Sequence, residues 1–205
     1  MDANQEDLQK IIEEFLNRFD YIRPEEIPDI PLYMDQVTTF MNSRMDYTRR
    51  YPEDKILTKT MINNYAKNRL LPPPEKKKYS RNHVLIMVFI YYFKNFLSIT
   101  DIQKLLMPLN DAFFDENSEH SLSDIYSRIF DLAPGKMEKL LSDLEQEALK
   151  CSRIFEDYPE EDQEFLQLFA SICMLSFDVY IRKQVIEKLL DHFPENPKKG
   201  TPKKK

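Results

Sequence analysis

The sequence predicts an all-α protein, and three observations lead to that prediction. The chain has 205 residues, of which 42% are hydrophobic, so it is long enough to build one domain or two small ones with a real core. Glycine occurs only twice, at Gly135 and Gly200, where average usage would give about 14. This scarcity excludes a phosphate-cradling loop and disfavours sandwiches and barrels, whose tight turns use glycine freely. Apolar residues also recur at helical spacing along most of the chain.

Apolar stripes separated by prolines and polar stretches define the expected helices in chain order. We expect them at about residues 5–19, 32–45, 59–69, 81–97, 121–132, 135–156 and 161–193, with a short one capped by Ser98 or Thr100 that ends near Leu106. The expected connections are an extended segment broken by Pro24, Pro28 and Pro31, polar loops at 46–56 and 109–120, a stop at Pro72–Pro74, and a disordered basic tail, PENPKKGTPKKK.

The most apolar segment lies in the expected helix 81–97, whose VLIMVFIYYF centre is apolar all round, as in a helix packed on several sides. This run, Val84 to Phe93, is about half as long as a bilayer span requires. A second apolar zone, Phe165 to Ile181, is interrupted by polar side chains at Gln167, Ser171, Ser176 and Asp178. The N-terminus is acidic and lacks the pattern of a signal peptide. We therefore expect a cytoplasmic protein without a membrane segment.

The segment 57–72 has the pattern of a helix that reads DNA. Thr58 is a plausible N-cap, and the apolar positions Met61, Ile62, Tyr65 and Ala66 share one face that points into a core. The opposite stripe has the spacing i, i+3, i+4, i+7 and consists of Thr60, Asn63, Asn64 and Lys67. Amides and hydroxyls in such a stripe can bond base edges while lysine reaches phosphates.

A basic loop follows this helix at the position of a wing. Lys76, Lys77 and Lys78 are consecutive and are followed by Tyr79, Ser80 and Arg81. Taken alone, a lysine triplet is most often a solvated loop, and a polar outer face is an ordinary surface helix. Together, at this spacing, the two features favour DNA binding.

From Leu57 to Leu106 the sequence resembles the winged helix-turn-helix of the MerR regulators. The matching features are Thr58, Tyr65, Leu70-Leu71-Pro72, Lys76 to Lys78, Tyr79-Ser80, and Ser98-Ile99-Thr100-Asp101-Ile102. The resemblance implies a recognition helix, a basic wing and a long helix behind it.

Four features depart from the MerR pattern. Asn63-Asn64 replaces the family's Arg-Tyr pair, and about a dozen extra residues precede the recognition helix. Arg69 stands where the family has glycine, so Asn68 or Arg69 is expected to adopt the left-handed exit. The wing is shorter and lacks glycine, so we expect a turn in place of a hairpin.

The whole chain, including IPLYMDQVTTFM and ILTKTMINNYAKNRLLPPPEKKKYS, also resembles a bacterial family catalogued as domain of unknown function 1836. That resemblance implies a transcriptional regulator and no enzyme activity.

The C-terminal half carries two long apolar stripes. One includes Met137, Leu140, Leu141, Leu144, Ala148, Cys151 and Phe155, and the other Phe165, Leu168, Phe169, Ile172, Leu175, Val179, Ile186, Leu190 and Phe193. They can pack against each other within one chain, or the longer one can be a dimerisation helix as the MerR resemblance suggests. Both can be true.

We expect no catalytic residue, metal site or cofactor. His83, His120 and His192 are far apart in sequence, with no second ligand at helical spacing and no cysteine pair beside them. Adjacent carboxylates such as Glu13-Glu14 are typical of solvated helix faces.

The charge is distributed unevenly around the expected DNA-binding segment. Residues 57–107 carry nine basic and two acidic side chains, a net charge of +7, within a chain whose net charge is −6. This is the electrostatic pattern expected of a DNA-binding protein.

The sequence thus predicts an N-terminal helix and connector (1–30), a MerR-like helix-turn-helix domain with a shortened wing (31–107), a helical dimerisation or effector domain with a long helix (108–194) and a basic tail (195–205). The predicted function is a sequence-specific, non-enzymatic regulator of transcription that binds double-stranded DNA as a homodimer, with an unidentified effector as a candidate further partner. The alternative is a helical protein-interaction adaptor that has lost DNA binding. The expected DNA-contacting residues are Thr58, Lys59, Thr60, Asn63, Asn64, Lys67, Arg69, Lys76, Lys77, Lys78, Tyr79 and Arg81.

Overall fold

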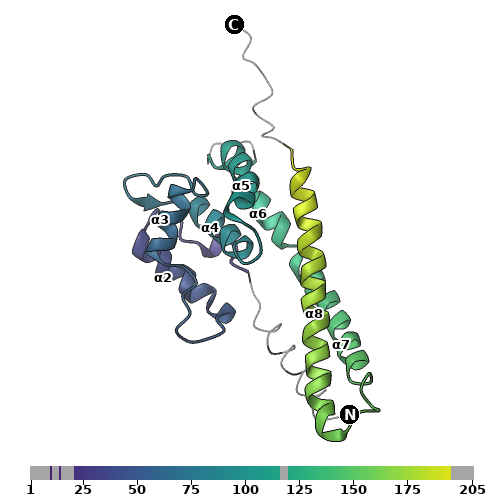
Figure 1. Ribbon diagram of the computed structural model, residues 1–205. Coiled ribbons are helices and arrows are strands. Elements are labelled where there is room, and N and C mark those ends of the chain that lie inside the picture. The colour runs from purple at the N-terminus through teal and green to yellow at the C-terminus, as the bar shows by residue number, and fades with distance from the viewer. Residues whose placement is uncertain (1–9, 11–13, 15–20, 116–119, 195–205) are drawn as a thin grey trace. The chain divides into compact units, whose positions relative to one another are not determined.

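The computed structural model describes residues 10, 14, 21–115 and 120–194, and over these residues the fold is all-α, as predicted (Figure 1). The helices are α2 (Met34–Arg44), α3 (Lys59–Lys67), α4 (Arg81–Phe93), α5 (Ile99–Phe113), α6 (Leu122–Phe130), α7 (Ala133–Cys151) and α8 (Glu160–Asp191), with short 3-10 turns η1 (Pro24–Glu26) and η2 (Asp46–Thr48). The predicted helix at 5–19 and the tail from 195 lie outside the described residues.

The described chain divides into two compact units. One comprises Tyr21–Phe130 together with residues 189–194, and the other comprises Asp131–Lys188. We call them the N-terminal unit and the helical-hairpin unit. Each is described by itself below.

Helix α4 is the centre of the N-terminal unit. All nine residues from Asn82 to Ile90 are buried, which fits the apolar sequence of this helix. Helices α5 and α6 and the strand β2 pack directly on α4, while α2 packs on α3 and on both strands. Helix α4 is therefore the core helix of this unit, and α3 joins the unit through α2.

Two short strands join the segments before α2 and after α3. β1 (Leu32–Tyr33) pairs antiparallel with β2 (Lys78–Tyr79), with Leu32 opposite Tyr79 and Tyr33 opposite Lys78. Leu32 and Tyr79 are buried, whereas Tyr33 is exposed. Strands of two residues carry no periodicity, so the sequence did not predict them.

Helix α5 is longer than the sequence predicts. We expected it to end near Leu106 ahead of Pro108, with a loop at 109–120, but it continues through Pro108 to Phe113. A proline inside a helix removes one backbone hydrogen bond and does not always end the helix. Here Leu106 and Ala112, on either side of Pro108, are both buried, so packing holds the helix together across the break.

The N-terminal unit is consequently broader than the predicted DNA-binding domain. The predicted boundary after residue 107 falls inside α5, and α6 packs on α4. On the other side, Ile22 and Ile27 of the expected connector are buried in the same unit. The domain limits follow the packing around α4 and not the changes in composition.

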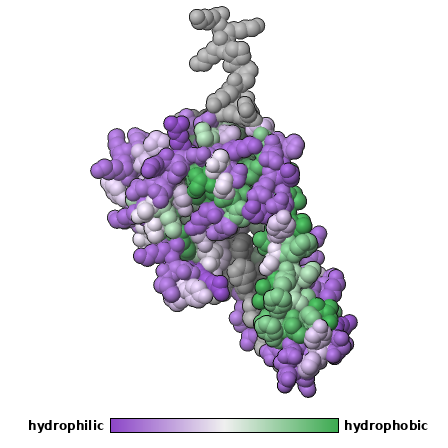
Figure 2. Space-filling view, viewed as in Figure 1, coloured by the Kyte–Doolittle hydropathy of each residue, from purple (hydrophilic) through white to green (hydrophobic). Residues whose placement is uncertain are grey.

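In the helical-hairpin unit, α7 and α8 run side by side (Figure 1). The Gln167 amide donates to the Ser152 carbonyl at 2.8 Å, and Cys151, Ala170 and Ser171 are the buried positions at this contact. Much of the apolar surface of α8 remains exposed, and Figure 2 shows hydrophobic residues gathered along it. By length and composition alone, α8 is also apolar enough to cross a membrane.

Candidate functional site

Helix α3 presents a polar, partner-free face to solvent. The Thr58 side chain accepts a hydrogen bond from the Met61 N–H at 3.2 Å, so Thr58 is the N-cap, as predicted. Ile62 and Tyr65 are buried and anchor the helix. The predicted outward stripe is exposed at every position: Thr60, Asn63, Asn64 and Lys67. In the described part of the chain, no hydrogen bond or ion pair engages these four side chains, so all of them are available to a ligand.

Helix α3 ends in a left-handed residue that is not glycine. Arg69 has φ 56°, and the Leu70 N–H donates to the Tyr65 carbonyl at 2.9 Å while the Arg69 N–H donates to the Ala66 carbonyl at 3.1 Å. These two bonds form a Schellman motif with arginine at the position that usually carries glycine. Arg69 therefore extends from the end of the helix into solvent.

The basic loop that follows is a tight turn, as its length predicts. Lys76 and Lys77 have φ 49° and 65°, and the Lys78 N–H donates to the Glu75 carbonyl at 2.9 Å. Positive φ at both central residues is characteristic of a type I′ turn, which strongly favours Asn-Gly. The turn places two exposed ammonium groups at its tip.

Three other basic residues that were expected to contact DNA already have a partner within the protein. The Arg81 guanidinium pairs with Asp29 at 2.9 Å, Lys59 pairs with Asp35, and the Lys78 ammonium lies 5.1 Å from the centre of the Tyr33 ring. Arg81 and Lys59 remain at least partly exposed and can exchange their carboxylate partners for a phosphate.

Tyr79 was predicted as a DNA contact, but it is only 4% exposed and packs behind the turn. Its backbone pairs with Leu32, and its ring meets the edge of the His83 ring. Burial raises the pKa of the Tyr79 phenol. Tyr79 therefore supports the turn from the interior of the protein, and it is too buried to contact DNA as predicted.

His83, in the first turn of α4, links the N-terminus of this helix to the proline segment that precedes the basic turn. Its Nδ1 accepts from the Ser80 N–H at 3.0 Å, and its Nε2 lies 3.4 Å from the Pro73 carbonyl, so Nε2 carries the proton. Burial lowers the pKa of His83, and its contacts with the Pro73 and Pro72 carbonyls oppose part of that shift. The imidazole thus acts as a neutral cap of α4 and anchors the proline segment between α3 and the turn.

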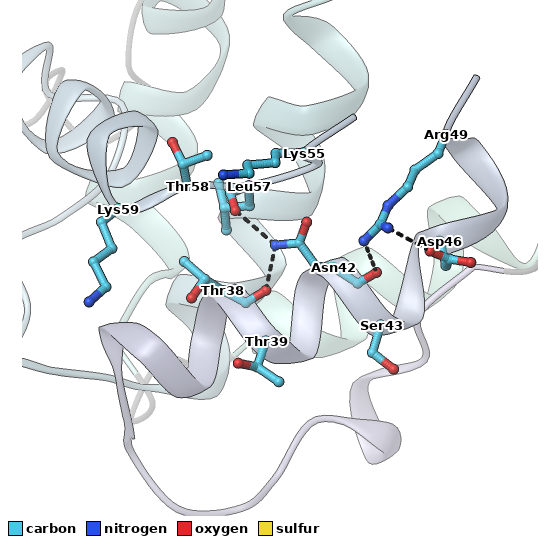
Figure 3. Close-up of a pocket in the computed structure, with 10 residues that line it drawn as sticks. All are labelled: Thr38, Thr39, Asn42, Ser43, Asp46, Arg49, Lys55, Leu57, Thr58 and Lys59. Atoms are coloured by element: carbon cyan, nitrogen blue, oxygen red, sulfur yellow. Dashed lines mark hydrogen bonds and ion pairs between the residues drawn. The ribbon is translucent and has the colours of Figure 1, made fainter. Parts of the chain in front are cut away.

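Beside the N-terminus of α3 lies an open polar hollow of about 670 Å³ that the sequence did not reveal (Figure 3). Asn42 of α2 lines the hollow and binds the backbone of the segment just before α3. Its amide donates to the Leu57 carbonyl at 2.8 Å, and its oxygen accepts from the Ile56 N–H at 3.1 Å. The other polar side chains around the hollow are four hydroxyls, three basic groups and one carboxylate, namely Thr38, Thr39, Ser43, Thr58, Arg49, Lys55, Lys59 and Asp46.

This geometry extends the candidate site beyond the predicted residues. The dozen extra residues before α3 were interpreted as a polar loop, because nothing in their pattern shows that Asn42 holds them against α2. In the structure they bring Lys55 beside Thr58 at the start of α3, whereas Arg49 lies at the opposite end of the hollow from Lys59 and donates to the Asn42 carbonyl of α2 at 3.3 Å (Figure 3). Arg49 is itself held by Asp46 at 3.1 Å.

Comparison with known families identifies the N-terminal unit. Residues 22–129, more than half of the chain, match the family described as Domain of unknown function (DUF1836). The chain belongs to this family. The matched range coincides within one residue at each end with the compact segment Tyr21–Phe130, so the DUF1836 domain is a structural unit as well as a sequence unit. No curated protein and no solved structure matches the chain significantly.

The DUF1836 domain contains the exposed face of α3, the left-handed basic turn and the polar hollow. The hairpin of α7 and α8 lies outside the matched range.

Proposed function

We propose that this chain is a sequence-specific, non-enzymatic DNA-binding regulator of transcription, in which α2 and α3 form a MerR-like helix-turn-helix and the turn at Lys76–Lys77 is a shortened wing. The protein acts as a cytoplasmic homodimer on double-stranded DNA and needs no cofactor. The observation that carries the proposal is the outward face of α3, whose exposed polar side chains have no partners within the described residues.

The chemistry of this face suits the major groove. Asparagine amides can bond adenine in a bidentate manner, and a threonine hydroxyl can bond several base edges. We assign Thr60, Asn63 and Asn64 to base edges. The Thr58 hydroxyl is engaged as the N-cap, so it stabilises the first turn of α3 beside them. Discrimination by one good bidentate contact is about 1–3 kcal/mol.

The basic side chains around α3 suit the phosphates on either side of the groove. They are Lys59, Lys67, Arg69, Lys76, Lys77, Lys78 and Arg81, joined by Arg49 and Lys55 at the polar hollow. Phosphate contacts position a protein on the duplex without reading its sequence. Acidic residues elsewhere in the chain oppose non-specific adhesion to nucleic acid.

Dimerisation is assigned to α8. On the side largely opposite its contact with α7, six apolar side chains are 38–70% exposed, namely Phe165, Leu168, Phe169, Ile172, Leu175 and Val179. Such a stripe offers on the order of 600 Å² of apolar surface, comparable to the roughly 800 Å² that each partner contributes to a standard interface. A lipid bilayer fits this stripe less well than a second copy of the chain. The Asp178 carboxylate would be costly to bury in the bilayer, and the acidic first turn of α8 would be repelled by an anionic membrane surface.

A selection experiment followed by a salt series tests DNA binding. The full-length protein is used to select duplexes from fragmented genomic DNA, and the affinity for a selected duplex is measured from about 50 to 200 mM salt. Counterion release predicts a fall in log affinity with a slope near −0.9 for each neutralised phosphate. Lys76→Ala should weaken binding to all duplexes and reduce the slope by about one, while Asn64→Ala should lower the preference for the selected sequence by about 1–3 kcal/mol.

The matched control is Lys136→Ala, an exposed lysine of α7, which should change neither quantity. The proposal is overturned if no fragment binds at about 50 mM salt, or if K136A weakens binding as much as K76A. In that event the second candidate function is the protein-interaction adaptor, which the exposed apolar stripe of α8 favours.

A further inference from the structure

An apolar pocket of about 290 Å³ lies within the N-terminal unit, away from the α3 face. Its walls come from α4, α5 and α6 and from the residues that follow α8. Four phenylalanines line it, namely Phe89, Phe93, Phe113 and Phe193, and the other lining residues are Leu105, Leu106, Pro108, Leu109, Ile129 and Pro194. No charged or hydrogen-bonding side chain is among them.

The size and lining of the pocket define the ligand that it fits. A dry apolar cavity of about 150 Å³ binds benzene, so this pocket accommodates about twelve non-hydrogen atoms. Aromatic rings pack favourably on phenylalanine in stacked or edge-to-face arrangements, whereas a charged group would lose its hydration without gaining a partner. The fitting ligand is a small, neutral, aromatic molecule.

Helix α5 connects the pocket to the DNA-binding face. Along the same helix, the Gln103 amide donates to the Asn68 carbonyl and the Asn110 amide donates to the Leu70 carbonyl at 3.2 Å. These two carbonyls flank Arg69, the left-handed exit of α3. Pro108, which lines the pocket, deprives α5 of one backbone hydrogen bond between these two attachments, and helices bend at such points.

We infer that this pocket is an effector site for a small neutral aromatic molecule, and that its occupation changes DNA affinity by moving α5 against the exit of α3. The second half of this inference rests on the proposed DNA binding, whereas the first half does not. A ligand that fills the pocket presses on α5 at Pro108, and α5 transmits the displacement to Asn68 and Leu70. Because linkage is reciprocal, DNA must change the affinity for the ligand by the same factor.

Titration of the full-length protein with 2-naphthol, monitored by its fluorescence, tests the site. This probe has about the required number of atoms, and naphthalene-2-sulfonate supplies nearly the same shape with a charge. We expect saturable binding of 2-naphthol and at least tenfold weaker binding of the sulfonate. Ile129→Trp at the pocket mouth should weaken 2-naphthol at least tenfold, whereas Ile99→Trp on the first turn of α5 should change it less than twofold; these isoleucines are 50% and 44% exposed.

Equal affinity of the wild type and I129W for 2-naphthol, or equal binding of the two probes, overturns the site. The regulatory half is measured with a selected duplex, for which saturating 2-naphthol should change the affinity at least fivefold in the wild type and not in I129W. If 2-naphthol binds in an I129W-sensitive manner and the duplex affinity stays constant, the coupling through α5 is wrong. If no duplex is bound at all, the proposed function fails, while the titration still decides whether the site exists.

Discussion

Three basic residues of the DUF1836 domain hold backbone conformations that glycine would adopt more easily. Arg69, Lys76 and Lys77 have positive φ, and they are the only residues with positive φ in the part of the chain that the structure describes. A left-handed residue with a side chain costs about 1–2 kcal/mol, and such strain is concentrated at functional sites. All three residues lie along the proposed phosphate-binding surface, so the strain is consistent with a requirement for their charges.

Replacing Arg69 at the end of α3 should change the stability of the protein and its affinity for DNA in opposite directions. Arg69→Gly should raise the free energy of unfolding by about 0.5–1 kcal/mol, because the left-handed strain outweighs the extra entropy of glycine in the unfolded chain. It should also weaken DNA binding by the loss of one phosphate contact. Chemical denaturation and a duplex titration measure the two effects.

The control for this prediction is Lys67→Gly, two residues earlier and still within α3, which should destabilise the protein by about 0.5–1 kcal/mol. A loss of stability in R69G would contradict the interpretation of Arg69 as strained.

His83 should make the stability of the domain depend on pH. Its pKa is lowered by burial, so the unfolded chain binds a proton more readily than the folded one. The contribution of His83 is therefore complete above its ordinary pKa of about 6.5 and is lost as pH falls from there toward the lowered value, with a slope of at most about 1.4 kcal/mol per pH unit.

His83→Gln provides the comparison, because glutamine three residues after Ser80 can accept from the same N–H and does not titrate. Unfolding free energies measured between about pH 7.5 and pH 5 should fall more steeply for the wild type than for H83Q. Parallel curves would show that His83 keeps its proton affinity on folding.

At the scale of elements, α8 exposes more apolar surface than a helix of a monomeric protein is expected to expose. A surface helix packed on one neighbour should have one apolar stripe, but α8 has a second, exposed one on the side largely opposite α7. Sequence periodicity detects both stripes and cannot say which of them is covered.

A charge placed in the exposed stripe tests the proposed dimer. Ile172→Glu should weaken self-association at least tenfold, because the carboxylate would be desolvated in the interface. Sedimentation equilibrium of the full-length wild type should give the mass of a dimer, and that of I172E the mass of a monomer at micromolar concentration.

Leu149→Glu changes a comparably exposed apolar residue of α7 and should leave the dimer intact. A monomeric wild type would contradict the assignment, and flotation of the wild type with lipid vesicles would assign the stripe to a membrane.

At the scale of the whole molecule, the position of each helix was predictable to within a few residues, except where α5 passes through Pro108. The exposed stripe of α3 and the left-handed exit at Asn68 or Arg69 were also predictable, since helical periodicity and the lack of glycine depend only on local sequence. The polar hollow was not, because Asn42 reaches residues 14 and 15 positions away. Nor was the burial of Tyr79, which depends on its pairing with Leu32.

The sequence by itself determined that this chain is helical, that residues 57–107 carry a net charge of +7 within a chain of net charge −6, and which face of α3 is polar. These properties follow from composition and from the 3.6-residue period, both of which are local. Only the tertiary structure decided where the DUF1836 domain ends, which basic residues of the candidate site pair with carboxylates, and that α5 lies between an apolar pocket and the exit of α3. These properties depend on contacts between residues distant in sequence, and burial around α4 is the physical reason that those contacts form.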